Sequence, residues 1–309
     1  MGIFYKWMMR LSVAIALLLM ASRGWAQQKT VLSQYMFNGL ALNPAYAGNQ
    51  NQLNVTGLYR KQWLNMDGAP NTQTLSAHAG FKNKKVGLGL LVSRDEIGVH
   101  RDMAVYASYA YKIRLNSGTL AMGLQGGFSQ LSSDFSQLSV KFADPSLSGS
   151  LVNMSPNFGT GLFYSNKTTY VGLSVPYLLN NRLYRTNDAG KLSKSAEARY
   201  YFLTAGKVLE VNKQVKVVPS MLLRMHEGAP LGVDVNMMVM LNEVVHLGAS
   251  YRSSDAAVFF FQLQVDPHFR FGYAYDLTLS SLSPYTQGSH EFMLNYSIKL
   301  TKDRCHTYF

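Results

Sequence analysis

Cysteine, charge and long apolar runs are all scarce in this chain of 309 residues. Its single cysteine, Cys305, excludes an internal disulfide and a cysteine-based zinc site. Charged residues make up 15% of the chain, compared with roughly 25% in an ordinary soluble domain. Disordered chains combine high charge with few aromatic residues, whereas 12% of these residues are aromatic. The composition therefore argues against disorder.

A short basic and apolar segment opens the chain. Basic residues precede an apolar run over 11–21, and Gly24 and Ala26 stand at the −3 and −1 positions of a cleavage site. This pattern predicts a secretory signal peptide over residues 1–26. A membrane anchor is disfavoured because the run is shorter than the roughly 20 residues of a spanning helix. The region around the cleavage site lacks cysteine, so a lipoprotein is not expected.

The chain is strongly basic, with a formal net charge of +12. Taken alone, this charge would suit nucleic acid or an anionic surface. An exported protein does not meet genomic DNA, so we predict no nucleic-acid partner. The charge points instead to anionic partners in the cell envelope, including outer-membrane lipid.

After residue 27 the dominant pattern is alternation of apolar and polar residues, the period of a half-buried β-strand. A second long apolar stretch and a sustained 3.6-residue period are both lacking, which excludes a helical membrane protein. The segments 102–115, 230–241 and 289–300 alternate over most of their length. They are longer than the usual strand of about 5–6 residues and fit tilted transmembrane strands of ~9–11 residues or more.

Fourteen such segments can be placed along the chain, and their connections alternate in length. The segments are 51–62, 71–82, 84–94, 102–115, 118–131, 155–165, 168–175, 196–209, 212–225, 230–241, 244–252, 256–265, 267–276 and 289–300. Every second connection is a tight turn, at Asn83, Asn116-Ser117, Asn166-Lys167, Glu210-Val211, Asn242-Glu243 and Asp266. The others are mostly longer, at 63–70, 95–101, 132–154, 176–195, 226–229 and 277–288, with 253–255 short. This segregation is typical of a bacterial outer-membrane barrel and not of a soluble β-sandwich.

The sequence therefore predicts an all-β protein whose main domain, 51–300, is a closed antiparallel transmembrane β-barrel of about fourteen strands. A short N-terminal segment, 27–50, is expected to lie in the periplasm or to plug the barrel. Residues 301–309 form a C-terminal tail. The sheet must close because each unpaired backbone group costs several kcal/mol in hydrocarbon. Apolar faces then contact lipid, and polar or small residues face the lumen.

Tyrosines on these strands are expected in the aromatic girdles at the two membrane interfaces. They are Tyr59, Tyr111, Tyr251, Tyr273 and Tyr275. Ordinary packing on a strand explains any single one of them equally well.

The sequence shows no arrangement typical of catalysis or of cofactor binding. The histidines are scattered, without the close spacing of a metal site. Gly172-Leu173-Ser174-Val175-Pro176 lacks the second glycine of a nucleophile elbow. Gly87-Leu88-Gly89 lacks the third glycine of a nucleotide-binding loop. We therefore predict no enzyme activity, no catalytic residue, no cofactor and no metal, with a barrel enzyme as a distant alternative.

Several short motifs follow one another over almost the whole chain after residue 27. They are Gln34-Tyr35-Met36-Phe37-Asn38, Leu42-Asn43-Pro44-Ala45-Tyr46-Ala47-Gly48, Tyr59-Arg60-Lys61-Gln62-Trp63, Gly68-Ala69-Pro70, Arg94-Asp95-Glu96-Ile97-Gly98, Val171-Gly172-Leu173-Ser174-Val175-Pro176, Gly248-Ala249-Ser250-Tyr251-Arg252, Gly272-Tyr273-Ala274-Tyr275-Asp276 and Gly288-Ser289-His290-Glu291-Phe292. Together they resemble the PorP/SprF family, outer-membrane proteins of the type IX secretion system and gliding machinery. The tail 301–309, with Cys305, extends beyond the point where similar proteins usually end.

The resemblance implies a non-enzymatic component in the cell outer membrane. It would assist export or surface display of a large partner, such as an adhesin with a C-terminal secretion signal, beside periplasmic type IX secretion components. The alternative is a porin or small-molecule transporter, since an open lumen could carry solutes. The segment 27–50 favours the first function, because a simple porin needs no such stretch before its first strand.

Candidates for partner contact or for the plug lie in the N-terminal segment and at the end of the first strand. They are Gln34, Tyr35, Asn38, Asn43, Pro44, Tyr46, Gly48, Arg60, Gln62 and Trp63. Arg60 and Gln62 share the polar face of 51–62, so we expect both in the lumen, with Trp63 at the upper membrane interface. Arg60 would need acceptors there, and carbonyl oxygens of the N-terminal segment are expected to supply them. Alternatively, these residues only stabilise the barrel.

The long connections 132–154 and 176–195 are expected on the cell surface, where irregular segments carry function more often than the scaffold does. The second is basic, and its candidate partner contacts are Arg182, Arg185, Lys191 and Lys194. This charge suits an acidic partner. The alternative is an ordinary solvated loop.

Overall fold

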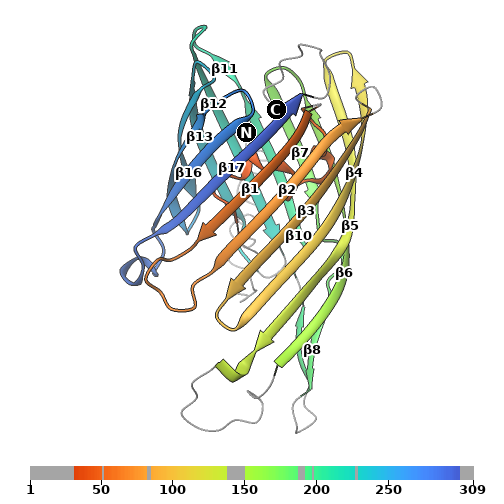
Figure 1. Ribbon diagram of the computed structural model, residues 1–309, viewed down its shortest axis with the longest axis vertical. Coiled ribbons are helices and arrows are strands. Elements are labelled where there is room, and N and C mark those ends of the chain that lie inside the picture. The colour runs from red at the N-terminus through yellow and green to blue at the C-terminus, as the bar shows by residue number, and fades with distance from the viewer. Residues whose placement is uncertain are drawn as a thin grey trace, which may run out of the picture.

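The protein is a closed ring of antiparallel strands (Figure 1). The computed structural model describes residues 31–50, 52–81, 85–137, 150–186, 192–196, 198–226 and 229–299. The predicted signal peptide, 1–26, and the tail 301–309 with Cys305 lie outside these residues. The strands of the ring are β1 (Gln52–Lys61), β2 (Asn71–Phe81), β3 (Val86–Ile97), β4 (His100–Leu115), β5 (Gly118–Asp134), β6 (Ser150–Ser165), β7 (Thr169–Val175), β10 (Tyr200–Lys207), β11 (Leu209–Glu210), β12 (Val215–His226), β13 (Gly232–Leu241), β14 (Val245–Arg252), β15 (Ala256–Gln264), β16 (Phe269–Thr278) and β17 (Ser289–Lys299).

Neighbouring strands pair with each other, and the first and last strands close the ring. β1 pairs with β17, and β10 pairs with both β7 and β12. The short β11 continues β10 past Val208 and also pairs with β12. Over the described residues the ring therefore has fourteen strand positions. This confirms the predicted antiparallel barrel.

Each predicted segment overlaps a strand of the ring, and the short and long connections lie at opposite ends of the barrel (Figure 1). The short-turn end, at the top of Figure 1, holds the turns 116–117, 166–168 and 242–244. The long-loop end holds 62–70 and 279–288, which lie at the lower left of Figure 1. The first strand starts and the last strand ends at the short-turn end.

The predicted long connection at 95–101 is wrong. β3 and β4 continue through it and leave only a tight turn at Gly98, whose φ is +56°. Charged residues at this end of the two strands are paired with one another: Glu96 forms ion pairs with Arg94 and with Arg101 on β4. The two strands can therefore extend past the apolar part of the wall without leaving charges unpaired.

The connection after β7 contains a hairpin that the sequence did not predict. β8 (Arg182–Thr186) pairs antiparallel with β9 (Leu192–Ala196), apart from the ring. Such short strands show too few alternations to stand out in a basic segment. In the other predicted surface connection, 132–154, both flanking strands extend further than expected, and residues 138–149 lie outside the described part.

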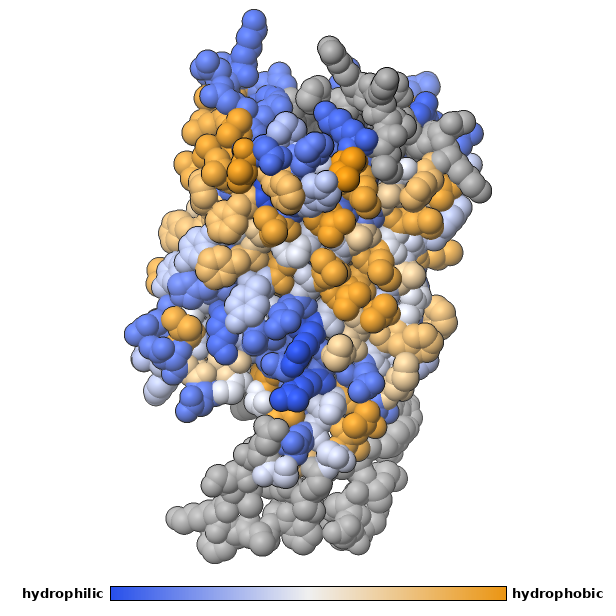
Figure 2. Space-filling model, viewed as in Figure 1, coloured by the Kyte–Doolittle hydropathy of each residue, from blue (hydrophilic) through white to orange (hydrophobic). Residues whose placement is uncertain are grey.

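The outer wall is apolar because alternate side chains of each strand point away from the lumen. On β4, Met103 and Val105 are 52% and 48% exposed, whereas Tyr106 and Lys112 are buried. Figure 2 shows apolar side chains over the wall, with hydrophilic groups gathered toward its two ends. The predicted alternation is confirmed. Five tyrosines also lie on this wall, and their place at the membrane interfaces stays a prediction: Tyr59, Tyr111, Tyr251, Tyr273 and Tyr275.

The helical elements of the described residues are short 3₁₀ turns. They are η1 (Tyr35–Phe37), η2 (Gly39–Ala41), η3 (Pro44–Tyr46), η4 (Phe135–Gln137) and η6 (Ser283–Tyr285). In this part of the chain, no helix has the length and apolar character needed to cross a membrane. The first three turns lie inside the barrel, where they build the candidate site.

Candidate functional site

Residues 31–50 form a compact segment inside the barrel, built from η1, η2 and η3. Asn43 caps η3, because its Oδ1 accepts the N–H of Ala45 at 2.9 Å. Pro44 occupies the start of that turn, where its missing N–H costs nothing. Leu40 and Ala45 are 1% and 0% exposed, because these side chains pack against the inner face of the barrel wall.

The segment runs lengthwise through the lumen. Near its start, Ser33 binds Glu291, the third residue of β17 from the long-loop end. Near its end, Gly48 binds His78 and Lys112, which lie close to the short-turn ends of β2 and β4. The N-terminal candidates therefore occupy the lumen from one end of the strands to the other.

Glu291 anchors the start of the segment through its backbone. Its two carboxylate oxygens accept the N–H groups of Ser33 and Gln34, each at 2.7 Å. The Ser33 hydroxyl lies 2.7 Å from both carboxylate oxygens of Asp276. Glu291 and Asp276 are 0% and 2% exposed, so both charges depend on these partners instead of on water.

Arg60 supplies the cation between these two carboxylates and is 1% exposed. Its Nη2 lies 2.7 Å from Asp276 Oδ2, and its Nη1 lies 3.3 Å from Glu291 Oε2. The same Nη1 donates to the Ser33 hydroxyl at 2.6 Å. The segment is thus held by an ion-pair network and does not merely rest against the wall.

The network continues along the long-loop end of the barrel. Arg252 Nη1 lies 3.3 Å from Asp276 Oδ2, and its Nε lies 3.1 Å from Asp234 Oδ2. Arg224 Nη2 lies 2.8 Å from the other oxygen of Asp234. All these residues stand within three positions of the long-loop ends of their strands. We call the group the latch cluster: Ser33, Arg60, Arg224, Asp234, Arg252, Asp276 and Glu291.

Amide groups hold the middle of the segment to the wall. The hydroxyl of Ser76 donates to Asn38 Oδ1 at 2.8 Å. The amide of Asn43 donates to the carbonyl of Leu162 at 2.9 Å. The asparagines singled out in the sequence therefore connect the segment to β2 and to β6, and β6 lies across the ring from the strand of Asp276.

Glycines on the inner wall allow the backbone of the segment to approach closely. A Cβ at Gly87 would lie 1.9 Å from the carbonyl oxygen of Ala47, and one at Gly123 would lie 2.1 Å from the nitrogen of Ala45. Neither position can hold a side chain while the segment stays in place. Gly57 of β1 has the opposite, outward parity, and a Cβ there would have its nearest atom 4.0 Å away. The wall is shaped to this segment.

Gly48 lies near the end of the segment, and its φ of +64° favours glycine. Its N–H donates to His78 Nδ1 at 3.2 Å, and its carbonyl accepts from Lys112 Nζ. The ring of Tyr46 packs edge-on against His78 and Phe163, with centroids 5.5 and 5.3 Å apart. Polar and aromatic contacts therefore fix this end as well.

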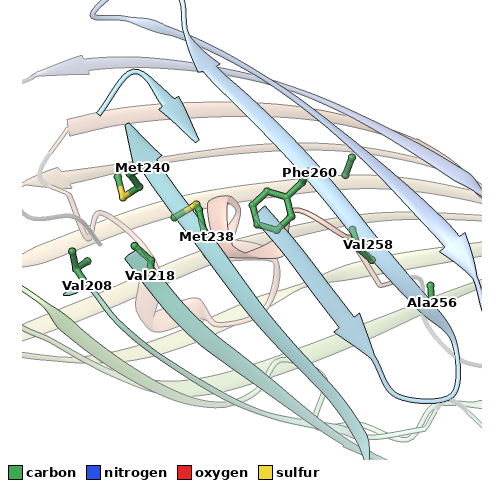
Figure 3. Packing of buried hydrophobic residues seen from close by; sticks show 8 residues of the cluster. Val208, Val218, Met238, Met240, Ala256, Val258 and Phe260 are labelled. Carbon is green, nitrogen blue, oxygen red and sulfur yellow. The ribbon is translucent and has the colours of Figure 1, made fainter. Parts of the chain in front are cut away.

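A cavity of about 420 Å³ lies beside the segment and reaches the short-turn end, where Lys299 lines it. One side is an apolar sector of the wall, against which Met36 and Phe37 of the segment pack. In Figure 3, Met238 and Phe260 of this sector lie beside the coiled ribbon of the segment. The volume falls in the range of ligand pockets, although barrel lumens are usually polar.

The structure brings Arg60 and the N-terminal candidates together, but places Gln62 and Trp63 elsewhere. Gln62 follows β1, and its N–H donates to the carbonyl of Pro70 at 2.9 Å. Trp63 is half-buried in the next loop with φ +45°, and its N–H donates to Ser289 Oγ at 3.2 Å. The expected acceptors for Arg60 are wrong, because it binds side-chain oxygens instead of carbonyls of the segment.

Sequence reasoning missed the carboxylate partners of Arg60. Asp276 and Glu291 stand 216 and 231 residues away from it, on strands that meet β1 only when the ring closes. Each is a carboxylate on the lumen-facing side of a strand in a chain with few charges. This pattern could have indicated the two carboxylates as partners of Arg60.

The predicted surface contacts lie near the long-loop end. Arg182 and Arg185 belong to β8 and Lys194 belongs to β9, whereas Lys191 lies outside the described residues. Their partner contacts stay a prediction. Among the residues that the structure describes, no group of three or more His, Cys, Asp or Glu side chains could hold a metal ion.

The fold and the enclosed segment define the class of protein, which is an outer-membrane β-barrel with residues 31–50 of the same chain inside its lumen. Residues 25–296 match the family model described as the type IX secretion system membrane protein PorP/SprF. The chain belongs to this family, as its motifs predicted. It is therefore an outer-membrane component of the type IX secretion system.

The chain is similar to solved outer-membrane barrels at low sequence identity. Omp33 of Acinetobacter baumannii is 9% identical with a TM-score of 0.46, and the match covers 80% of this chain and 97% of that one. The monoaromatic hydrocarbon channel CymD is 13% identical with a TM-score of 0.50, covering 84% and 91%. At this identity the likeness to CymD shows the fold alone. No protein with a curated description matches this chain.

Proposed function

We propose that the protein is a non-enzymatic barrel that assists export or surface display of a large partner protein, such as an adhesin with a C-terminal secretion signal. The observation that carries this proposal is the segment 31–50, which is enclosed in the lumen and bonded near both of its ends. A diffusion channel needs an open lumen, whereas a segment fixed by buried ion pairs works against free passage. We propose that the segment acts as a plug.

The orientation proposed follows the general rule that short turns of such barrels face the periplasm and long loops face outward. The latch cluster then lies beneath the surface loops. The 420 Å³ cavity reaches the periplasmic end of the barrel, where Gln52 and Lys299 line it. Periplasmic type IX secretion components would approach from this side.

The plug offers a physical connection between the two sides. Ser33 belongs to the latch cluster, and Gly48 is bonded near the opposite end. A partner that pulls on either end must break bonds made by the same short segment. We propose that secretion partners act through this connection, with basic residues of 176–195 contacting an acidic surface of the exported protein.

Secretion assays in two variants test the coupling. Arg60→Ala removes the cation shared by Asp276 and Glu291 and the hydrogen bond to Ser33, so the start of the segment loses part of its attachment. The variant should still insert in the outer membrane but should fail to export its surface protein. Arg101→Ala removes an arginine whose side chain is 59% exposed at the same end, and it should export normally. Wild-type export by both inserted variants would contradict the coupling.

Conductance distinguishes the proposal from the porin alternative. The wild-type barrel in a planar bilayer should conduct ions poorly, and deletion of residues 31–48 should raise its conductance. A large, stable conductance of the wild-type protein, together with normal secretion by the deletion variant, would favour a small-molecule transporter.

A further inference from the structure

A depression of about 640 Å³ lies on the outer wall over β7, β10, β12, β13, β14 and β15. Large side chains stand around it, including Val171, Met237 and Phe259, which are 42%, 52% and 54% exposed. Ala205 and Ala249 lie between them on the same outer face. The depression is therefore apolar and faces lipid.

The sequence explains why the outer surface of the barrel is depressed at this point. The pairing of β10 with β12 ends at Gly206, and the pairing of β11 begins at Leu209. Pro219 of β12 faces this gap and has no N–H to donate to a neighbouring strand. Outward side chains nearby are small, with alanine on three strands: Ala205, Ala249 and Ala257.

The depression is long enough for an acyl chain. It crosses six neighbouring strands, and five steps of ~4.7–4.9 Å make a length of roughly 24 Å. One lipid leaflet contributes about half of the ~30 Å hydrocarbon core. The acyl chain of one leaflet is therefore shorter than the depression, and the whole chain can lie within it.

A cation stands at one border of this apolar surface. Lys207, the last residue of β10, lines the depression close to the short-turn end and is exposed. Its register partner on β7 is Thr169, which also lines the depression and offers a hydroxyl group. Within the described chain, Lys207 forms no ion pair with a carboxylate. A lysine near the membrane surface attracts anionic lipid, by about 1 kcal/mol.

We infer that this depression binds one glycerophospholipid with an anionic headgroup. The phosphate contacts Lys207 and Thr169, and one acyl chain lies across Ala205 and Ala249. The site does not depend on the proposed secretion role. It requires only that the barrel lies in a membrane.

Native mass spectrometry of the full-length protein, released from a mild detergent, tests the site with dioleoyl-phosphatidylglycerol as the added lipid. Lys207→Glu reverses the charge at the border, and Ala249→Trp fills the depression. Each variant should bind the lipid about tenfold more weakly or worse, equivalent to ~1.4 kcal/mol. The matched controls are Lys85→Glu, at an exposed lysine of the short-turn end, and Ala107→Trp, at an exposed alanine of β4.

Loss of binding in both test variants, with both controls unchanged, supports the site. Equal binding by all variants, or equal loss in the controls, overturns it and leaves only unspecific annular lipid. Phosphatidylcholine bound as tightly as phosphatidylglycerol overturns the role of Lys207. A membrane protein retained in place of lipid, and lost in Ala249→Trp, overturns the lipid assignment. Heat-dependent gel migration of each variant verifies that its barrel is folded.

Discussion

Arg60 and Asp276 form an ion pair of 2.7 Å although their strands, β1 and β16, do not pair with each other. β17 lies between the two strands, and both side chains are at most 2% exposed. Ser33 bridges them, because its hydroxyl accepts from Arg60 and donates to Asp276. Closure of the ring and docking of the N-terminal segment therefore depend on the same buried charges.

Removal of Glu291 should destabilise the barrel strongly. Glu291→Ala deletes the acceptor of two backbone N–H groups and leaves Arg60 with a single carboxylate. Breaking a buried ion pair by removal of one partner costs about 3–5 kcal/mol. Equilibrium unfolding in urea should show a loss of this order, whereas Glu210→Ala, at an exposed carboxylate of β11, should stay within about 0.5 kcal/mol of wild type. Equal stabilities of the two variants would show that the latch cluster does not contribute to the free energy of unfolding.

The strands could be predicted from the sequence because alternation is a local property. Met103 and Val105 of β4 need only their own neighbours to indicate an outward face. The same rule places Arg60 in the lumen but says nothing of its partners, since these lie on strands that approach only after closure. The predicted connection 95–101 was wrong, because ion pairs of Glu96 sustain the two strands beyond the apolar wall.

A side chain at Gly123 should expel the plug without opening the ring. Gly123→Val places a Cβ 2.1 Å from the nitrogen of Ala45, so the segment must move while the strand keeps its pairing. Conductance in planar bilayers should rise toward that of the 31–48 deletion. Gly57→Val is the control, because this position has the outward parity of β1 and its Cβ has no neighbour closer than 4.0 Å, so its conductance should match wild type. Equal conductance of the two variants would mean that the segment does not limit passage.

Acid should loosen the turn between β15 and β16. Asp266 accepts the N–H groups of His268 and Phe269 at 2.7 and 3.0 Å, and these bonds hold its pKa below the usual range. A carboxylate whose pKa is lowered by folding stabilises the turn above its unfolded pKa, and the effect is lost as pH falls through the folded pKa. Hydrogen-exchange protection of the two amides should therefore drop in acid. Asp266→Asn should show no such step, and a step of equal size in that variant would assign the titration to another group.

Cysteine labelling in whole cells should reveal which end of the barrel faces outward. Tyr285 of η6 is 71% exposed at the long-loop end, and Lys213 is exposed in the turn at the opposite end. In a Cys305→Ser background, a membrane-impermeant maleimide should label Tyr285→Cys in intact cells. Lys213→Cys should react only after the outer membrane is permeabilised, because the reagent must first enter the periplasm. The reverse pattern would invert the barrel and bring the latch cluster to the periplasmic side, where surface partners could not reach it.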